Sequence, residues 1–270
     1  MTITADSGST KTTWLLADGG SSWQILTHGI NPFHQSYETM SDIVRNELLA
    51  HSDYPTNAKV SEIHFYGAGC TKVKSPLLKT ILQEAFPESK VEVDSDMLGA
   101  AKALFNNKEG IACILGTGSN SCLYDGNGIV CGVSPMGYIL GDEGSGAVLG
   151  KTFVNMLYKG GHSDMISIFE RETGLCQADI VQKVYREPLP NRFLASLAPF
   201  IKAHTEETWV REMATDCFRL FFQRNTSHYN RPDLPCSFVG SIAYHFAAEL
   251  HEAAKREGVT IGKIMKEPLL

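Results

Sequence analysis

The chain has 270 residues, of which 43% are hydrophobic and 20% are charged. Because one domain typically takes roughly 100 to 200 residues, we expect two domains of ordinary size. No apolar run approaches the roughly 18 residues that a membrane-spanning helix needs, and the net charge of -6 argues against a basic nucleic-acid-binding surface. The composition therefore predicts a globular protein whose partners are small molecules, and neither membrane nor nucleic acid.

The cysteines and the N-terminal residues indicate the redox state of the thiols and the location of the protein in the cell. Seven cysteines, an odd number, are scattered without a Cys-x-x-Cys pair, so we expect free thiols rather than a disulfide framework or a metal site. Cys113, Cys122 and Cys131 recur every nine residues, which we interpret as successive strands. Residues 1–5 form a strand-like run without the features of an export signal, so we expect a cytoplasmic protein.

Residues 1–107 alternate between strand and helix patterns, which predicts an α/β domain. Three strands joined by turn residues come first, and alternating helices and strands follow. The predicted strands cover 1–6, 12–18, 22–28, 62–67 and 91–93, and the predicted helices cover 37–50, 75–86 and 96–104.

Residues 108–270 repeat this order and predict a second domain with a helical insertion. Thr10–Asp18 aligns with Thr117–Asp125, because in both a turn rich in Gly, Ser and Thr precedes a strand and an Asp-Gly turn. A period above 100 residues predicts two copies of one domain that face each other across a central cleft. The predicted strands cover 111–115, 120–124, 128–131 and 236–240, followed by a short final strand, and the predicted helices cover 144–158, 191–205, 207–229 and 242–257.

The two turns that the repeat aligns can each bind a phosphate group. Because glycine has no Cβ, such turns can bring several backbone N–H groups close to a phosphate. Lys11 adds a positive charge to the first turn, and Asp6 is placed to hold Mg²⁺ through water. Either turn alone is typical of an ordinary hairpin, but the matched pair favours phosphate binding. The candidate residues are Gly8, Ser9, Thr10 and Lys11 in the first turn, and Thr117, Gly118 and Ser119 in the second.

A third turn follows the strand predicted near 236–240. Gly240 and Ser241 lie where this strand gives way to a helix. Glycine at this place lets a flat base or a ribose approach the backbone closely. A tight connection between strand and helix explains the same residues equally well.

Asp94 and Asp96 lie where the strand at 91–93 gives way to a helix. Capping of that helix is a sufficient structural reason for Asp96. The functional alternative is a general base that receives the proton of an acceptor hydroxyl as the hydroxyl attacks a γ-phosphate. Strand alternation puts Asp94 on the sheet face opposite to Val91, which favours Asp96 for this role.

Asp142 and Glu143 lie in a run of small residues, Gly141–Gly146, that begins a predicted helix. The helix dipole favours acidic residues at this end, which is a sufficient structural reason for both. Two carboxylates here would also suit the binding of sugar hydroxyl groups.

Four motifs in order resemble the BadF/BadG/BcrA/BcrD ATPase family, and within it the chain is similar to N-acetylglucosamine kinases. This resemblance implies two ribonuclease-H-like domains of the actin-like ATPase fold, which close on ATP and Mg²⁺. The motifs are residues 6–12, 114–120, 137–145 and 239–243.

The resemblance also implies roles for single residues. Thr10 and Lys11 match the first phosphate motif, Thr117 and Gly118 match the second, and Asp96 matches the catalytic base. Met136 stands where the kinases of animals have tryptophan, which leaves the acceptor sugar open. The other matches are Gly240 and Ser241 to the adenosine motif, Asn31, Asn120 and Asp142 to amino-sugar contacts, and Gly137 to the same sugar pocket.

The leading hypothesis is an ATP-dependent kinase that phosphorylates N-acetylglucosamine at O6. The alternative is an ATPase that activates a CoA-thioester reductase or dehydratase, which would need closely placed cysteines at a subunit interface for an iron-sulfur cluster. Whether the protein forms a homodimer stays open at this point.

Overall fold

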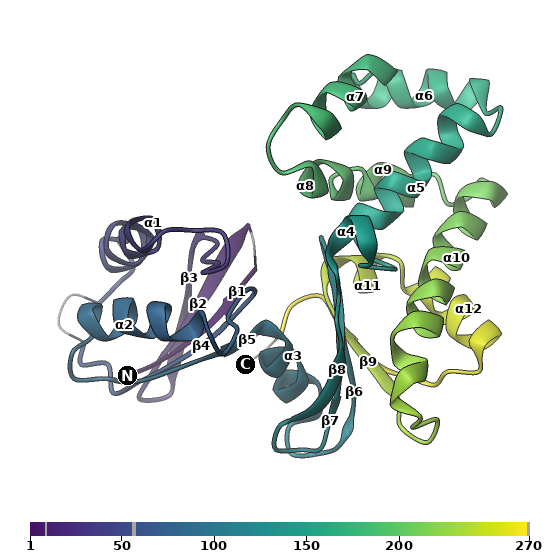
Figure 1. The fold of residues 1–270 in the computed structure, drawn as a ribbon. Coiled ribbons are helices and arrows are strands. Elements are labelled where there is room, and N and C mark those ends of the chain that lie inside the picture. The colour runs from purple at the N-terminus through teal and green to yellow at the C-terminus, as the bar shows by residue number, and fades with distance from the viewer. Residues whose placement is uncertain (9, 56–57, 269–270) are drawn as a thin grey trace. The chain divides into compact units, whose positions relative to one another are not determined.

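The computed structural model describes residues 1–8, 10–55 and 58–268. The chain divides into two compact units, an N-terminal unit of Met1–Ala103 and a C-terminal unit of Leu104–Glu267. Each unit contains one five-stranded mixed sheet and its own hydrophobic core (Figure 1). Within the described ranges, no helix combines the length and the apolar composition that crossing a membrane requires.

The sheet of the N-terminal unit has the strand order β3-β2-β1-β4-β5. β1 (Thr2–Ser7), β2 (Lys11–Asp18) and β3 (Ser21–His28) form an antiparallel meander. β4 (Glu62–Gly67) pairs in parallel with β1 and with β5 (Lys90–Ser95). Alternate residues of β1 and β2 are buried, as expected for strands with one face in the core.

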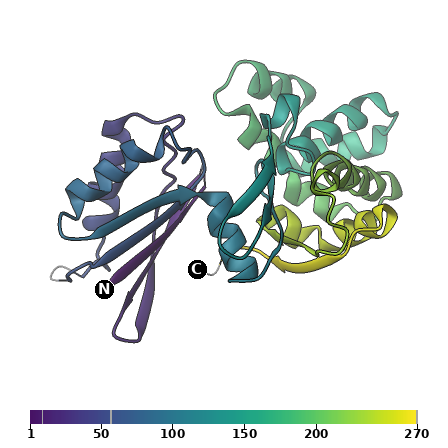
Figure 2. The ribbon, with the colours of Figure 1, turned by 60° about the horizontal axis from the view of Figure 1, so that its bottom comes forward.

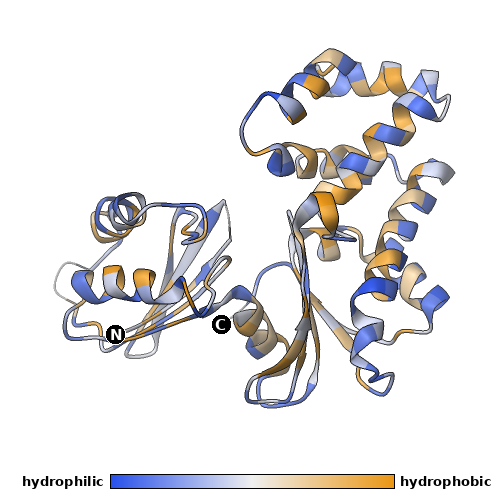
Figure 3. Ribbon diagram, viewed as in Figure 1, coloured by the Kyte–Doolittle hydropathy of each residue, from blue (hydrophilic) through white to orange (hydrophobic). Residues whose placement is uncertain are grey.

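One face of this sheet is covered by α1 (Tyr37–Asp42), the π-helical segment η1 (Ile43–Leu49) and α2 (Ser75–Ala85) (Figure 2). Apolar and polar residues alternate along the ribbon of α2, so only one side of this helix enters the core (Figure 3). In that core the rings of Trp14 and Phe65 meet edge to face, with their centroids 5.6 Å apart. The single helix predicted over 37–50 is wrong in its second half, which is π-helical.

α3 (Asp96–Phe105) begins directly after β5 and packs on β4. A Cβ at Gly99 would lie 2.7 Å from the Cβ of Tyr66, so only glycine allows this close approach. Lys102 Nζ donates a hydrogen bond to the Tyr66 hydroxyl at 3.1 Å. These contacts hold the start of α3, and with it Asp96, against β4.

The sheet of the C-terminal unit has the strand order β10-β9-β6-β7-β8. β6 (Gly110–Leu115), β7 (Ser119–Tyr124) and β8 (Ile129–Val133) form an antiparallel meander, and β9 (Cys236–Val239) pairs in parallel with β6 and with β10 (Ile261–Met265). A meander of three strands followed by two parallel strands is also the topology of the N-terminal sheet. The duplication predicted from the sequence is therefore confirmed at the level of topology.

Helices of the C-terminal unit pack on its sheet and extend beyond it (Figure 1). The sequence pattern missed α6 and α7, although both are amphipathic. The helix predicted over 191–205 is two helices, since Pro199 cannot continue the preceding one, and the helix predicted over 242–257 is also two. The helices are α4 (Gly137–Leu140), α5 (Gly146–Lys159), α6 (Ser163–Thr173), α7 (Gln177–Tyr185), α8 (Pro190–Ala195), α9 (Ala198–Ala203), α10 (Thr208–Arg224), the 3₁₀ turn η2 (Thr226–Tyr229), α11 (Ser241–His245) and α12 (Ala247–Glu257).

A buried ion pair joins α9 to α12 and gives a first prediction. Lys202 Nζ contacts both carboxylate oxygens of Glu249, at 2.9 and 3.0 Å, and the Glu249 side chain is only 4% exposed. Lys202→Met leaves this carboxylate buried without its partner. We expect the free energy of unfolding to fall by about 2 kcal/mol, which is less than for a fully buried ion pair because Lys202 is partly solvated. In urea unfolding, the double variant Lys202→Met/Glu249→Leu should recover most of this loss. A double variant as unstable as the single one would contradict this account.

Candidate functional site

The carboxyl ends of β1, β4 and β5 lie side by side at one edge of the N-terminal sheet. The strand register pairs Ser7 with Gly67 and Gly67 with Ser95, so these residues lie at one level. The first phosphate turn directly follows Ser7, and Asp96 directly follows Ser95. Ligands of open α/β sheets bind outside the carboxyl ends of the strands. The fold thus brings the predicted phosphate turn and the predicted base to the edge where a ligand is expected.

The backbone of the first phosphate turn is held by hydrogen bonds at both sides. Gly8 N–H donates to the carbonyl of Lys11 at 3.0 Å, and Gly29 N–H donates to the carbonyl of Thr10 at 3.1 Å. Lys11 begins β2 and is exposed. Ser9, a predicted phosphate contact, lies outside the described residues.

Two buried hydroxyl groups connect this turn to the end of β3. The Oγ of Ser7 and the Oγ1 of Thr12 lie 2.7 Å apart, and the backbone N–H of Ile30 donates to both, at 2.9 and 3.2 Å. Ser7 also donates to the carbonyl of Ile30. Asn31, the next residue along the chain, is consequently held close to the phosphate turn. Asp6 precedes Ser7 at the end of β1, at the same edge.

Asn31 packs against the loop that follows β4. Its backbone N–H donates to Gln35 Oε1 at 2.7 Å, and its Oδ1 accepts the N–H of Phe33 at 2.9 Å. Gly69 has a positive φ of 78°, and a Cβ at this residue would lie 2.1 Å from the Oδ1 of Asn31. Glycine is therefore required at 69 for Asn31 to occupy this place.

Asp96 occupies the first position of α3 with its carboxylate half-buried. Met97 N–H donates to Asp96 Oδ1 at 2.9 Å, whereas Leu98 N–H is capped by Ser95 Oγ at 3.3 Å. Burial raises the pKa of Asp96, and the hydrogen bond from Met97 opposes this rise. A carboxylate with a raised pKa is a stronger proton acceptor than a solvated one, which suits a general base.

Cys70 is buried in the loop after β4 and is near enough to Asp96 for the charge of that carboxylate to affect it, although the sequence pattern singled out neither this thiol nor the preceding glycine. Burial raises the pKa of Cys70 to about 12, and the negative charges of Asp96 and Asp94 add to the rise. The thiol therefore stays neutral and behaves as a small apolar side chain. The sequence signal was the small-residue run at 67–70, whose contact with Asn31 comes from a distant part of the chain.

In the C-terminal unit, the second phosphate turn is attached to the start of α5. Gly116 N–H donates to the carbonyl of Gly118 at 3.0 Å and closes the turn. Gly146 N–H donates to the carbonyl of Gly116 at 2.8 Å, and Ala147 N–H donates to that of Thr117 at 3.1 Å. The buried Ser145 caps α5 by accepting the N–H of Val148. Ser145 was missed, although a serine before an apolar helix is a recognised start signal.

Asp142 lies against the same turn. Its carboxylate accepts the backbone N–H of Ser119, and a Cβ at Gly118 would lie 3.0 Å from its Oδ2. Burial raises the pKa of Asp142 to about 6, and the charge of Glu143 adds to the rise, while the Ser119 hydrogen bond and the charge of Lys151 oppose it. The predicted sugar contact and the predicted second phosphate turn are therefore direct neighbours.

Gly240 places the predicted adenosine turn against the end of β6, next to the predicted second phosphate turn. Its φ of 128° is one that other residues rarely adopt, and a Cβ there would lie 2.2 Å from the carbonyl oxygen of Leu115, the last residue of β6. Ser241 begins α11 and is exposed. The turn after β9 thus lies directly beside the strand that leads into the second phosphate turn.

The remaining predicted sugar contacts, Asn120 and Gly137, are connected less directly to Asp142. Asn120 follows Ser119 in β7, and its Oδ1 accepts the N–H of Ser121 at 2.9 Å. Gly137 begins α4, has a positive φ of 74° and accepts the N–H of Gly141 at 2.7 Å. Gly137 therefore lies on the loop that ends at Asp142, whereas the hydrogen bonds of Asn120 and Gly137 go to Ser121 and Gly141.

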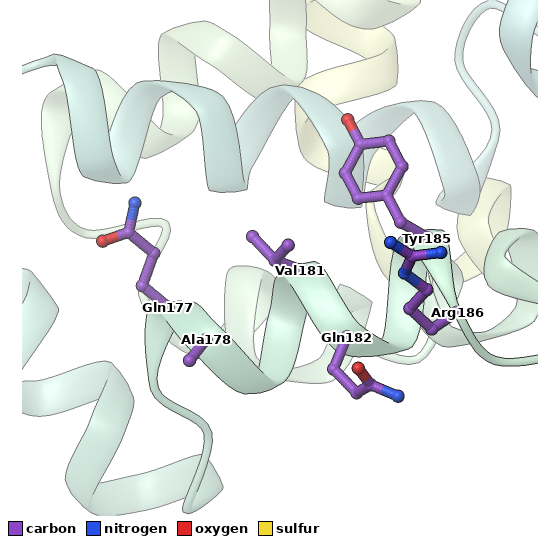
Figure 4. Close-up of a pocket in the computed structure, with 6 residues that line it drawn as sticks. All are labelled: Gln177, Ala178, Val181, Gln182, Tyr185 and Arg186. Atoms are coloured by element: carbon purple, nitrogen blue, oxygen red, sulfur yellow. The ribbon is translucent and has the colours of Figure 1, made fainter.

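A separate pocket lies on the surface of α7. Its six lining residues all come from this one helix and the residue after it, as Figure 4 shows. Tyr185 in this lining is 75% exposed, so the pocket is an open surface groove. It contains none of the predicted site residues that the structure describes.

Comparison with known proteins identifies the class. No protein-family model and no curated protein matched the chain. Among solved structures, a candidate N-acetylglucosamine kinase from Porphyromonas gingivalis is 46% identical, with 100% of this chain and 96% of that chain covered and a TM-score of 0.94. A candidate N-acetylglucosamine kinase from Chromobacterium violaceum is 19% identical, with 96% and 93% covered and a TM-score of 0.70. A ROK family glucokinase from Streptomyces griseus, solved with glucose and AMPPNP, is 14% identical, with 99% and 94% covered and a TM-score of 0.57.

The last two similarities show that the chain shares its fold with sugar kinases of low sequence identity. This fold is the duplicated α/β architecture of the actin-like ATPases. The first is close enough to define a family. The chain belongs to the family of N-acetylglucosamine kinase-like sugar kinases, as the four motifs predicted.

The close approach at Gly240 predicts a stability effect. Gly240→Ala would place a methyl group against the Leu115 carbonyl, so we expect the free energy of unfolding to fall by at least about 3 kcal/mol. Gly161 is a matched control, because its φ of 76° is also positive but a Cβ there would meet no atom within 4 Å. Gly161→Ala should cost only about 1 kcal/mol. Urea unfolding measures both values, and equal losses would contradict the proposed steric conflict.

The raised pKa of Asp142 predicts a pH-dependent stability. A carboxyl group whose pKa is higher in the folded protein stabilises it below the unfolded pKa of about 3.9, and this stabilisation is lost as the pH rises through about 6. Asp142→Asn should therefore be more stable than the wild type near pH 7, by about 1 to 2 kcal/mol after allowance for solvent screening, and equally stable near about pH 4.

Asp125→Asn serves as the control with the opposite sign. Backbone hydrogen bonds from Gly128 and Asn127 lower the pKa of Asp125, so its ionised form stabilises the fold and its replacement should destabilise the protein near about pH 7. Both comparisons use urea unfolding across the pH range. Asp142→Asn that is less stable than the wild type at neutral pH would refute the assignment.

Proposed function

We propose that this protein transfers the γ-phosphoryl group of ATP to O6 of N-acetylglucosamine. The observation that carries the proposal is the shared sheet edge of the N-terminal unit, where the first phosphate turn, Asn31 and Asp96 lie close to neighbouring strand ends. A phosphate-binding turn beside a carboxylate is the arrangement that phosphoryl transfer to a hydroxyl group needs. The 46% identity to a candidate N-acetylglucosamine kinase supports the choice of acceptor.

In this proposal, backbone N–H groups of both phosphate turns bind the phosphate groups of ATP, and the Lys11 ammonium adds a positive charge. Gly240 and Ser241 bind the adenosine part, because the missing Cβ of Gly240 leaves its backbone open on one side. The attachment of the second turn to α5 and to Asp142 keeps its N–H groups in a fixed orientation. Rigid donors of this kind stabilise charge that develops during the reaction.

Asp6 is the proposed holder of Mg²⁺. Its carboxylate is an oxygen donor of the type that Mg²⁺ prefers, and it lies at the strand end from which the phosphate turn starts. When bound there, the ion would supply positive charge that offsets the negative charge of the phosphate groups beside this turn. Asp6 would act through water, so its own task is to orient the hydrated ion beside the turn.

The proposed sugar contacts are those that the sequence motifs imply. Asn31 in the N-terminal unit offers an amide, and Asp142 and Asn120 in the C-terminal unit offer a carboxylate and an amide to the hydroxyl groups and the acetamido group. Gly137 provides backbone at the same pocket. Because Asp142 accepts hydrogen bonds best when ionised, its pKa of about 6 predicts weaker sugar binding in acid.

Asp96 is the proposed catalytic base. It accepts the proton of the C6 hydroxyl as the new bond between O6 and the γ-phosphorus forms and the bond from that phosphorus to the β-phosphate oxygen breaks, which releases ADP. The burial that raises the Asp96 pKa makes this carboxylate a better proton acceptor. Its position is fixed by Gly99 and Lys102, which hold α3 against Tyr66.

The cytoplasm, where ATP and free sugars meet, is the proposed location, and a small-molecule sugar is the proposed partner. A homodimer is compatible with this function but is not needed for it, because each role above is filled from one chain.

Asp96→Asn tests the proposal. Loss of the base should lower kcat for sugar-dependent ADP release by at least about 100-fold, with KM for ATP changed little, because the replacement keeps the shape of the side chain. Asp94→Asn is the matched control two residues earlier, on β5, and should retain most activity. The assay should cover a panel of amino sugars, with the mass of each product confirmed. Wild-type turnover in Asp96→Asn would contradict the assignment of Asp96 as the catalytic base.

A further inference from the structure

Glu143 connects the loop that carries Asp142 to a distant helix. Its Oε1 accepts a hydrogen bond from Arg224 Nη1 at 3.1 Å, and its Oε2 accepts one from Asn225 Nδ2 at 3.5 Å. Arg224 and Asn225 lie at the C-terminal end of α10, about eighty residues further along the chain. The Glu143 side chain is only 15% exposed, whereas Arg224 is 63% exposed and remains in contact with water.

The residue after Glu143 packs on the same helix. Gly144 has a positive φ of 72°, and a Cβ at this residue would lie 3.1 Å from the Cβ of Phe221 and 3.3 Å from a ring carbon of Phe218. Asn225 Nδ2 also donates to the carbonyl of Phe221 at 3.2 Å, which fixes the side chain that Glu143 meets. Two successive residues after Asp142 are therefore anchored on α10.

Asp142 itself needs such support. Its φ of 54° is positive, a conformation that costs free energy in residues other than glycine and persists only where the surroundings impose it. On one side its backbone N–H donates to the carbonyl of Pro135 at 3.0 Å, and on the other side lies the anchored pair Glu143 and Gly144. With both sides held, the carboxylate is directed at the Ser119 N–H of the second phosphate turn.

We infer that Glu143, held by Arg224, is a positioning residue that fixes the Asp142 carboxylate for sugar binding. The inference rests on the proposed function in one respect, the assignment of Asp142 to the sugar. The simpler reading is that Glu143 only stabilises the start of α5 through the helix dipole. The two readings differ in what happens to the protonation of Asp142.

Two charged groups act on the Asp142 carboxylate, and a third pairs with one of them. Glu143 raises its pKa and Lys151 of α5 lowers it, while Arg224 of α10 pairs with Glu143. Lys151 is itself held by the carbonyl of Tyr138, to which its Nζ donates at 2.8 Å. Removal of the negative charge at 143 should therefore lower the pKa of Asp142, and removal of the positive charge at 224 should raise it, because Glu143 then loses its counterion.

The experiment compares Glu143→Gln and Arg224→Gln in the full-length chain. Carboxyl ¹³C NMR without substrate follows the titration of Asp142, identified by its loss in Asp142→Asn. We expect the titration to move down by about half a pH unit in Glu143→Gln and up by a similar amount in Arg224→Gln. At neutral pH, KM for N-acetylglucosamine should rise at least about fivefold in Arg224→Gln, with KM for ATP within about twofold of the wild type. Arg224→Lys should restore part of the sugar affinity.

Arg219→Gln is the matched control, because Arg219 also lies on α10 but pairs with Glu257 and Asp216. It should leave the Asp142 titration unchanged. Shifts in the same direction in both test variants, or no shift in either, would overturn the inference, as would an unchanged KM for the sugar in an active Arg224→Gln. If the wild-type protein phosphorylated no amino sugar, the proposed function would fail, while the titrations would still decide whether Glu143 and Arg224 control Asp142.

Discussion

In each sheet, the first strand of the meander pairs in parallel with a strand from later in the chain, and the rest of the structure depends on this pairing. In the N-terminal unit, β1 pairs with β4, and in the C-terminal unit the equivalent strand β6 pairs with β9. Parallel strands end at the same edge, so each pairing places a glycine-containing turn beside a second loop from far along the chain. In the first unit these are the turn after Ser7 and the loop at Gly69, and in the second they are the turns after Leu115 and Val239.

At the sheet edge of each unit, backbone segments approach each other closely and a carboxyl group is partly removed from water. Gly69 and Gly240 allow contacts that a Cβ would prevent, so Asn31 meets the β4 loop and the β9 turn meets β6. Burial removes water from Asp96 and Asp142 and raises the pKa of both carboxyl groups. The fold gives up some stability at neutral pH to keep these acids where they lie, as is common where binding and catalysis need poised groups.

Much of the fold could be predicted from local sequence, and the site only in part. Turns of Gly, Ser and Thr are determined by backbone geometry, so the positions of both turns and the duplication around them were accessible, while their binding of phosphate stays a prediction. α6 and α7 were not, although both are amphipathic, because His162 and Cys176 at their starts are not among the residues that typically cap a helix. Contacts between distant segments, such as Gly69 with Asn31 and Glu143 with Arg224, have no local signature at all. The roles assigned to single site residues stay predictions until they are measured.

The most direct test of the central claim is the identity of the phosphorylated product. Wild-type protein, ATP, Mg²⁺ and N-acetylglucosamine would be incubated together and followed by proton-coupled ³¹P NMR. The account predicts a new phosphate monoester signal split into a triplet by the two protons of C6, together with an equal amount of ADP. A doublet would place the phosphate on a secondary hydroxyl group, and inorganic phosphate as the only product would mean that water is the acceptor; either result would contradict the account.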